Sequence, residues 1–255
     1  MNTTFLRAAA ALTVGGVLAT LPAFAASPCS VNSGELTPVI VELYTSEGCD
    51  SCPPADRWLS KTITERSKDA AFIALAYHVD YWDYIGWKDA FAQPAFAQRQ
   101  STLAANGGAS GVYTPQIFVN GSDDRSWTSG AARRAAAGRA SVKFSVTTHW
   151  KSEGAALSMG ITGKLTEPAP GVRFRYALTE NGLVSAVKAG ENRGVTLHHD
   201  AVVRATGALP TDAIGAFALN VPVPRVVRQA NSLLHVIAED ARGKPLAAAT
   251  LSCAG

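Results

Sequence analysis

The sequence predicts an α/β domain with the element order βαβαββα, followed by a β-sandwich domain. Residues 38–139 alternate short apolar runs rich in β-branched residues with segments of helical spacing. From Val142 onward the apolar residues recur with a period of two, as in half-buried strands. The chain has 255 residues, of which 47% are hydrophobic and 17% charged, which is enough for two cores. We place the boundary near Ala140, giving domains 26–140 and 141–255.

Residues 1–25 have the pattern of a secretory signal peptide. Arg7 precedes an apolar run, and Ala23 and Ala25 are the small residues expected before a cleavage site. A membrane anchor is the alternative, but the run is shorter than the roughly 20 residues that a spanning helix needs. We therefore expect a mature chain that begins near Ala26, lacks a membrane span, and is periplasmic or secreted.

The first domain is predicted to combine short strands with helices. Four segments rich in β-branched and aromatic residues predict its strands: 38–44, 71–79, 116–121 and 125–127. Three segments with helical spacing or capping residues predict its helices: 55–68, 94–105 and 130–139.

The second domain is predicted to be all β. Seven alternating segments predict its strands: 143–148, 157–162, 172–178, 195–204, 214–221, 232–239 and 246–252. Asn181-Gly182 is a dipeptide typical of a tight hairpin turn.

Cys49 and Cys52 carry the main functional prediction. They lie between a predicted strand and a predicted helix, separated by two residues. Thiol–disulfide exchange needs an attacking thiolate and a second thiol that resolves the mixed disulfide. The helix N-terminus lowers the pKa of a nearby thiol. We expect Cys49 to be the exposed attacking thiol and Cys52 the more buried resolving one. An inert local disulfide and a metal site are the alternatives.

Two acidic residues beside Cys49 oppose formation of its thiolate. Glu47 and Asp50 place negative charge close to the sulfur. We therefore expect the pair to be more reducing than the strongly oxidising dithiols of the periplasm.

Cys29 and Cys253 are the other two cysteines of the chain. An oxidising compartment lets disulfides persist, and the termini of a domain often lie close together. We expect a structural disulfide Cys29–Cys253. The alternative is that Cys29 lies on a frayed end and stays free.

Thr114-Pro115 precedes the third strand at the end of the sheet where Cys49 is expected. A cis Pro115 would bring the Thr114 backbone to the dithiol and offer a docking edge for a substrate chain. The alternative is a trans proline that opens an edge strand. Tyr81 and Trp82 follow the second strand and are expected to shape substrate access. They could equally form a lid that packs its own aromatic rings.

Three ionisable residues are weaker candidates for proton transfer. His78 and Asp80 follow the second strand, at the same sheet edge as the dithiol. Glu42 lies inside the first strand, either as a proton acceptor beneath Cys52 or as an edge-facing residue. For His78 the alternative is a hydrogen-bonded core histidine.

A structural zinc site, a metal site at the adjacent histidines and a nucleic-acid site are not expected. A structural zinc site needs four ligands, and the sequence has no second closely spaced cysteine pair. The adjacent His198 and His199 of a predicted strand point to opposite faces, so both cannot bind one metal ion. The net charge is +3, with no block of Lys and Arg typical of a nucleic-acid patch.

Several motifs together resemble one family of secreted bacterial proteins, domain of unknown function 1223. The motifs that carry the resemblance lie at 41–56, 78–83, 113–116, 190–192, 197–200 and 202–204. The resemblance implies a thioredoxin-like fold for the first half, with Cys49, Cys52 and Pro115 at the corresponding positions. Gly48, where ordinary thioredoxins have Trp, and the aromatic insertion depart from that pattern.

These observations lead to one main functional hypothesis. We expect an exported thiol–disulfide oxidoreductase that needs no cofactor but requires a redox partner and a thiol or disulfide substrate. One alternative is a protein that binds Cu(I) through Cys49, Cys52 and His78. Another is a non-catalytic interaction protein whose Cys49–Cys52 bond is only structural.

Overall fold

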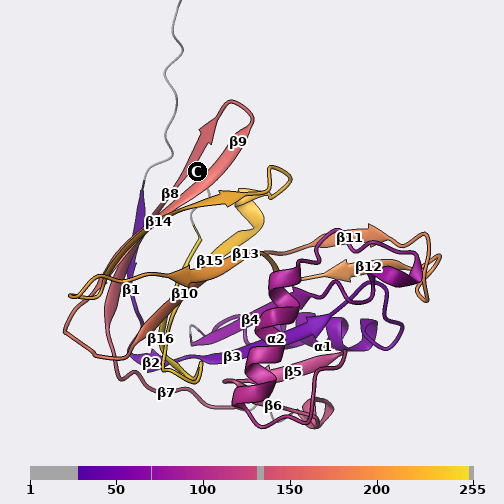
Figure 1. Ribbon diagram of the computed structural model, residues 1–255, viewed down its shortest axis with the longest axis horizontal. Coiled ribbons are helices and arrows are strands. Elements are labelled where there is room, and N and C mark those ends of the chain that lie inside the picture. The colour runs from indigo at the N-terminus through magenta and orange to yellow at the C-terminus, as the bar shows by residue number, and fades with distance from the viewer. Residues whose placement is uncertain (1–27, 70, 131–134, 253–255) are drawn as a thin grey trace, which may run out of the picture.

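A computed structural model describes residues 28–69, 71–130 and 135–252 of the chain. One eight-stranded mixed sheet runs through the molecule (Figure 1). Its strands are β3 (Val39–Thr45), β4 (Phe72–His78), β5 (Gln116–Val119), β6 (Ser122–Asp123), β10 (Arg173–Glu180), β13 (Val202–Leu209), β15 (Ser232–Glu239) and β16 (Pro245–Leu251). The strand order is β16-β15-β10-β13-β4-β3-β5-β6.

Three smaller sheets flank this sheet. A four-stranded sheet has the order β1-β8-β9-β14, a hairpin joins β11 to β12, and β2 pairs with β7. These strands are β1 (Cys29–Asn32), β2 (Leu36–Thr37), β7 (Gly138–Arg139), β8 (Phe144–Glu153), β9 (Ala156–Leu165), β11 (Leu183–Ala186), β12 (Thr196–His199) and β14 (Ala216–Val223). Single 3-10 turns are found at Asp83–Ile85, Trp127–Ser129 and Gln229–Asn231.

Two α-helices, α1 (Pro53–Glu65) and α2 (Pro94–Asn106), cover opposite faces of the β4-β3-β5 part of the large sheet (Figure 1). Strand β3 is buried on both faces, and its side chains alternate between two cores. Val41 and Leu43 pack with Leu59 of α1, whereas Tyr44 packs with Phe96 of α2. Neither helix has the length and apolar character needed to cross a membrane, within the described residues.

The predicted fold class, a thioredoxin-like βαβαββα domain followed by a β-sandwich domain, is wrong. The chain is mainly β, and strands from both sides of residue 140 share the eight-stranded sheet. The junction is β13, which lies parallel to β4 with Val202 opposite Ala76. An unpaired β4 would expose a row of backbone donors and acceptors. The Ala76 N–H instead donates to the Ala201 carbonyl at 2.8 Å.

The strands of the second half also divide differently from the prediction. The four-stranded sheet packs on β10, β15 and β16, where Phe144 and Phe174 lie ring to ring at 5.0 Å. Strand β10 pairs with β13 and β15, so Asn181-Gly182 does not close a hairpin between β10 and β11. The predicted strand 195–204 is two strands, β12 and β13.

Two predicted elements near the middle of the chain are wrong. Trp127 begins a 3-10 turn rather than ending a strand, and the short fourth strand is β6. The helix predicted over 130–139 ends instead in β7, which pairs with β2; residues 131–134 lie outside the described part. Pairing with a distant strand decides the conformation of β7, and no local pattern indicates it.

Candidate functional site

A disulfide joins Cys49 and Cys52 in the loop between β3 and α1. Their Cα atoms lie 5.4 Å apart. Cys52 directly precedes α1, and Pro53 and Pro54 occupy the first helical positions. Proline is well suited there because its missing N–H has no intrahelical partner to lose. The sulfur pair therefore sits at the N-terminal end of a helix, as the spacing predicted.

Both cysteines are buried, each with 0% exposed surface. The exposed position expected for Cys49 is therefore wrong. Only the tip of the turn, Asp50 and Ser51, is exposed. The Ser51 hydroxyl lies 3.3 Å from Cys49 Sγ.

A segment from the second half of the chain contacts the dithiol turn. The side-chain amide of Asn192 donates to the backbone carbonyls of Glu47 and Cys49, both at 2.9 Å. The Glu191 carboxylate accepts the backbone N–H of Asp50 at 3.1 Å. Asn192 is buried. These three hydrogen bonds fix the segment 190–192 against the turn, and we call this segment the cover segment.

The aromatic loop that follows β4 contacts the same turn from another side. A Cβ at Gly48 would lie 3.2 Å from Trp82 Cβ and from Ile85 Cδ1. Gly190 of the cover segment also approaches Ile85, and its backbone adopts a positive φ of 73°. Glycine at these two positions therefore lets the loop, the cover segment and the dithiol turn pack closely.

Of the predicted substrate-binding residues, Tyr81 and Trp82 lie on this loop, and Thr114 and Pro115 lie directly before β5. The Trp82 indole N–H donates to the Thr114 hydroxyl at 2.7 Å, and the Thr114–Pro115 bond is cis. The Tyr81 hydroxyl donates to Gln100 at 3.2 Å. Trp82 thus lies against both the cis-proline segment and the dithiol turn.

Five ionisable side chains are buried beside the disulfide turn, and we call them the buried cluster. They come from the turn, α1, β4, the aromatic loop and β12: Glu47, Asp56, His78, Asp89 and His199. Burying five ionisable groups is costly unless their charges and hydrogen bonds compensate. Such a cluster is therefore a candidate site for proton transfer.

Asp89 connects three parts of the buried cluster. Its carboxylate contacts His78 Nδ1 at 2.7 Å and accepts the backbone N–H of Glu47 at 2.9 Å. The Oε2 atom of the Glu47 carboxylate accepts the indole N–H of Trp87 at 2.7 Å. The rings of His78 and His199 lie edge to face, with centroids 4.9 Å apart. The cluster is thus continuous from β4 to the dithiol turn.

Several buried polar atoms of the cluster have no hydrogen-bond partner among the described residues. They are Glu47 Oε1, His78 Nε2 and both ring nitrogens of His199. Two of these atoms, His199 Nε2 and Glu47 Oε1, face each other at 3.3 Å, which is an ion-pair distance although the geometry is not that of a hydrogen bond. Orphaned buried donors and acceptors are rare in folded proteins, and each one costs about 1–3 kcal/mol. Their concentration beside one disulfide favours a functional role.

The protonation equilibria of the cluster are shifted. Burial raises the pKa of Asp56, although His199 and His78 partly oppose this. Burial alone would lower the pKa of His78, but the charge and hydrogen bond of Asp89 outweigh it and raise that pKa. Burial would raise the pKa of Asp89, but the charge and hydrogen bond of His78 outweigh it and keep that pKa below its ordinary value. The cluster can therefore hold protons close to the disulfide.

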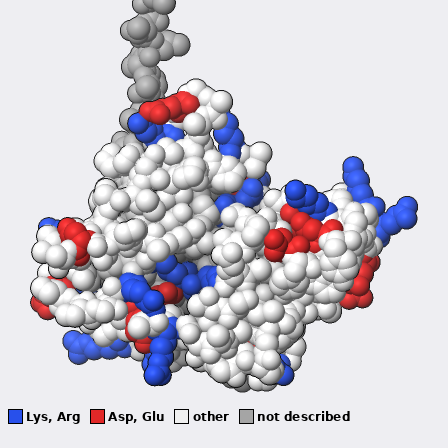
Figure 2. Space-filling model, viewed as in Figure 1, with Lys and Arg blue, Asp and Glu red and all other residues white. Residues whose placement is uncertain are grey.

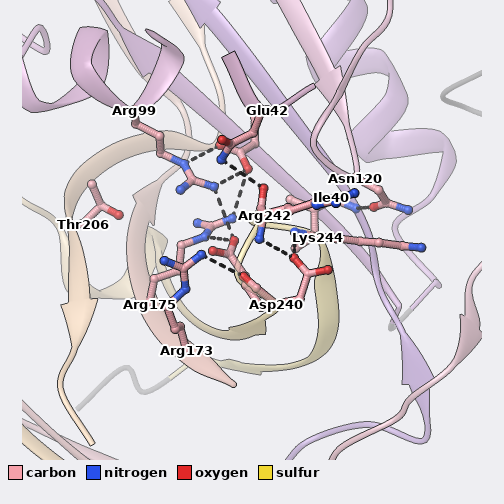
Figure 3. Close-up of polar contacts among 12 residues, drawn as sticks. Ile40, Glu42, Arg99, Asn120, Arg173, Arg175, Thr206, Asp240, Arg242 and Lys244 are labelled. Carbon is pink, nitrogen blue, oxygen red and sulfur yellow. Dashed lines mark hydrogen bonds and ion pairs between the residues drawn. The ribbon is translucent and has the colours of Figure 1, made fainter. Parts of the chain in front are cut away.

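Glu42 lies elsewhere. It is on the α2 face of β3, with Tyr44, whereas α1 covers the other face. Arg99 and Arg175 bind its carboxylate (Figure 3). Burial raises the pKa of Glu42, but the two arginines outweigh this and hold it at about 2. Asp80 is partly buried at the start of the aromatic loop. The structure thus brings His78, but not Glu42, near the dithiol.

Sequence reasoning missed four residues of this site: Asp56, Asp89, Asn192 and His199. Asp56 follows Cys52 by one helical turn, so its place on the inner face of α1 could have been predicted. His199 is buried and His198 exposed, which confirms that the two point to opposite faces. Asp89 and Asn192 reach the site through loops, and no local pattern indicates this.

Two further predictions concern the Cys29–Cys253 disulfide and metal binding. Cys29 begins β1, but Cys253 lies outside the described residues, so the Cys29–Cys253 bond stays a prediction. Within the described ranges, no group of three or more His, Cys, Asp or Glu side chains is arranged to hold a metal ion.

Two solved structures are similar to this chain. The crystal structure of protein AGR_C_4864 from Agrobacterium tumefaciens has 26% sequence identity and a TM-score of 0.52, and the match covers 86% of this chain and 95% of that one. HBP35 of Porphyromonas gingivalis has 15% identity and a TM-score of 0.54, over 86% of this chain and 76% of that one. The second likeness concerns the fold alone.

A family model described as "Protein of unknown function (DUF1223)" matches residues 40–238. The chain therefore belongs to this family, as the motifs of the sequence indicated. No curated protein matches it. The family match covers both the dithiol turn and the cover segment, which lie more than a hundred residues apart in the sequence.

Proposed function

We propose that this protein is a thiol–disulfide oxidoreductase whose Cys49–Cys52 pair exchanges with substrate when the cover segment moves away. The observation that carries the proposal is the buried cluster of titratable side chains, with unpartnered polar atoms, directly beside the disulfide. A purely structural disulfide needs no such cluster, and an apolar surrounding would cost less free energy.

The exchange proceeds in two displacement steps. A substrate thiolate attacks Cys49 Sγ, a new S–S bond forms, and the Cys49–Cys52 bond breaks with Cys52 leaving as a thiolate. A second substrate thiolate then attacks the substrate sulfur of the mixed disulfide, and Cys49 leaves. The substrate dithiol loses two electrons and two protons, and both cysteines become thiols. The reverse sequence reduces a substrate disulfide.

Each leaving thiolate needs a proton, and each attacking thiol must lose one. Asp56 lies one turn of α1 after Cys52, and burial raises its pKa above the ordinary range of an aspartate, which suits it to exchange protons with the cysteines. His78 and Asp89 extend this route into the cluster. Asp80 is a weaker candidate for proton transfer, since it lies at the start of the loop.

Substrate access involves the cis-proline region. Thr114 and Pro115 are partly buried next to Trp82, and Tyr81 is 37% exposed. We assign these residues to substrate binding, because an extended chain laid along them would approach the dithiol turn. A cellular redox partner must restore the starting state after each turnover, and no cofactor takes part.

The test is exchange between the full chain and a peptide dithiol, followed by thiol alkylation and mass measurement. Cys49→Ser is expected to abolish exchange, whereas Cys29→Ser, which leaves the Cys49–Cys52 pair intact, keeps it. Equilibration with glutathione buffers should give a potential above about −300 mV, the limit below which structural disulfides lie. A pair that stays oxidised in those buffers, or a rate unchanged in Cys49→Ser, overturns the proposal.

A further inference from the structure

A hollow lies on the α2 face of the large sheet. It has a volume of about 340 Å³, and its walls come from α2, β10, β13 and the turn after β15. Figure 2 shows basic and acidic side chains gathered in a hollow between α2 and these strands. The volume falls within the range of small-molecule sites, about 300–1,000 Å³. Neither cysteine of the dithiol lines it.

Arg99, Arg175 and Glu239 line this pocket, and the buried Glu42 pairs with both arginines (Figure 3). We call these four residues the floor. Arg99 binds Glu42 through two hydrogen bonds of 2.7 Å, and Arg175 binds both Glu42 and Glu239. Arg175 and both glutamates are buried. The four charges cancel, so the floor is neutral, and its mutual ion pairs hold the four side chains in place. A rigid floor positions its remaining donors without loss of side-chain entropy on binding.

Two arginines keep donors available to the pocket. Arg99 is 19% exposed, and its Nη1 has no hydrogen-bond partner among the described residues. Arg173 is exposed and uses Nη2 for two backbone carbonyls, which leaves Nε and Nη1 available within the described part of the chain. Both residues line the pocket. A guanidinium group with free donors binds an oxyanion well.

The charge and shape of the pocket restrict the ligand. Arg173 adds one positive charge to the neutral floor, which suits a monoanion. A dianion would bring two negative charges to a site that has one unmatched positive charge and the carboxylate of Glu239 in its wall. Leu103, Phe174 and Ala208 provide apolar wall beside the donors. A ligand with an apolar body and one anionic end would match both the apolar wall and the arginine donors.

We propose that this pocket binds a small organic monocarboxylate, with its carboxylate at Arg99 and Arg173 and its apolar body against Leu103 and Phe174. The site is independent of the redox function, since it lies on the other face of β3 from α1.

The test is calorimetric titration of the full chain with benzoate, its neutral analogue benzamide, and inorganic phosphate. Benzoate is expected to bind at one site per chain, and more tightly than either of the other two. Arg173→Gln leaves the buried floor intact and is expected to weaken benzoate about tenfold, or about 1.4 kcal/mol. No benzoate binding, or equal binding of phosphate or benzamide, overturns the assignment.

Two variants of α2 localise the binding. Thr102 lines the pocket and Ser101 does not; both are exposed, and each hydroxyl bonds the carbonyl four residues earlier. Thr102→Phe fills the pocket and should abolish benzoate binding, whereas Ser101→Phe should change it less than about twofold. Equal affinities in these two variants, with unchanged melting curves, place the binding elsewhere and overturn the proposal.

Discussion

Asn192 donates its side-chain amide to the backbone carbonyl of Cys49 at 2.9 Å, across 143 positions of the sequence. The same amide holds the carbonyl of Glu47. One side chain from the second half of the chain thus holds the cover segment against the disulfide turn. This relationship connects the stability of the site to access to its sulfur atoms.

Removing this contact should open the site. Asn192→Ala leaves two buried carbonyls without their donor, and we expect a loss of about 1–3 kcal/mol in the free energy of unfolding. The Cys49–Cys52 bond should be reduced by dithiothreitol about tenfold faster, measured by timed alkylation at a temperature where the variant is folded. The neighbouring exposed Arg193→Ala is the control and should match the wild type. Equal reduction rates in all three proteins would show that the cover segment does not limit access.

Asp56→Asn should separate stability from activity. The pKa of Asp56 is raised by burial, so its folded-state stability contribution is greatest at low pH and falls as pH rises through that pKa. At pH 7 the neutral isostere is expected to raise the Tm by about 2–4 °C. Exchange should slow about 100-fold and lose its dependence on pH in the acidic range.

The control for this variant is Asp50→Asn, which neutralises an exposed carboxylate beside the same disulfide. It should leave the Tm close to that of the wild type and keep the acidic-range pH dependence of exchange that Asp56→Asn loses. If Asp56→Asn melts lower and reacts at the wild-type rate, Asp56 is not the proton donor that we assign.

His78 should make stability depend on pH. Its raised pKa means that the protonated ring, paired with Asp89, is favoured in the folded state. Its contribution is complete below about pH 6.5 and is lost as pH rises through the folded-state pKa. Urea unfolding between pH 6 and 9 should show this decline in the wild type, with a flatter profile in His78→Gln. His198→Gln, an exposed control on β12, should keep the wild-type slope; an unaltered slope in His78→Gln contradicts the assignment.

Glu42 should matter for stability rather than for exchange. Glu42→Gln leaves Arg99 and Arg175 with one buried carboxylate fewer, which should cost about 3–5 kcal/mol in urea unfolding at pH 7. The pKa of Glu42 is held at about 2, so its contribution is present above about pH 4.5 and is lost as pH falls through about 2. The exposed pair of Glu35 and Lys143 offers the control: Glu35→Gln should leave the free energy of unfolding close to that of the wild type.

Trp82 should affect substrate binding more than chemistry. Trp82→Phe removes the donor to the Thr114 hydroxyl, and we expect KM for a peptide substrate to rise about threefold to tenfold with little change in kcat. Tyr84 stacks on Trp82 and is 82% exposed. Tyr84→Phe is therefore the control, because it changes an aromatic residue of the same loop without removing a hydrogen bond to another described residue. A lower kcat at constant KM in Trp82→Phe would place this residue in the chemical step instead.

The family and the local elements were accessible from the sequence because their signals are local. The apolar runs at 38–44 and 71–79 became β3 and β4, and the prolines at 53 and 54 marked the start of α1. The Cys49–Cys52 disulfide followed from its spacing, and the cysteines, the cis-proline segment and His78 proved to be neighbours of one loop system. Periodicity, helix starts and short spacings depend on residues a few positions apart.

Only the tertiary structure decided how the two halves combine. The pairing of Val202 with Ala76 merges the predicted domains into one sheet, and Asn192 and His199 reach the dithiol turn from the second half. As a result the sulfurs are buried, and the buried cluster lies beside the turn that holds them. Hydrogen bonds between residues more than a hundred positions apart leave no periodicity in the sequence, because each partner alone satisfies its local pattern equally well in many arrangements.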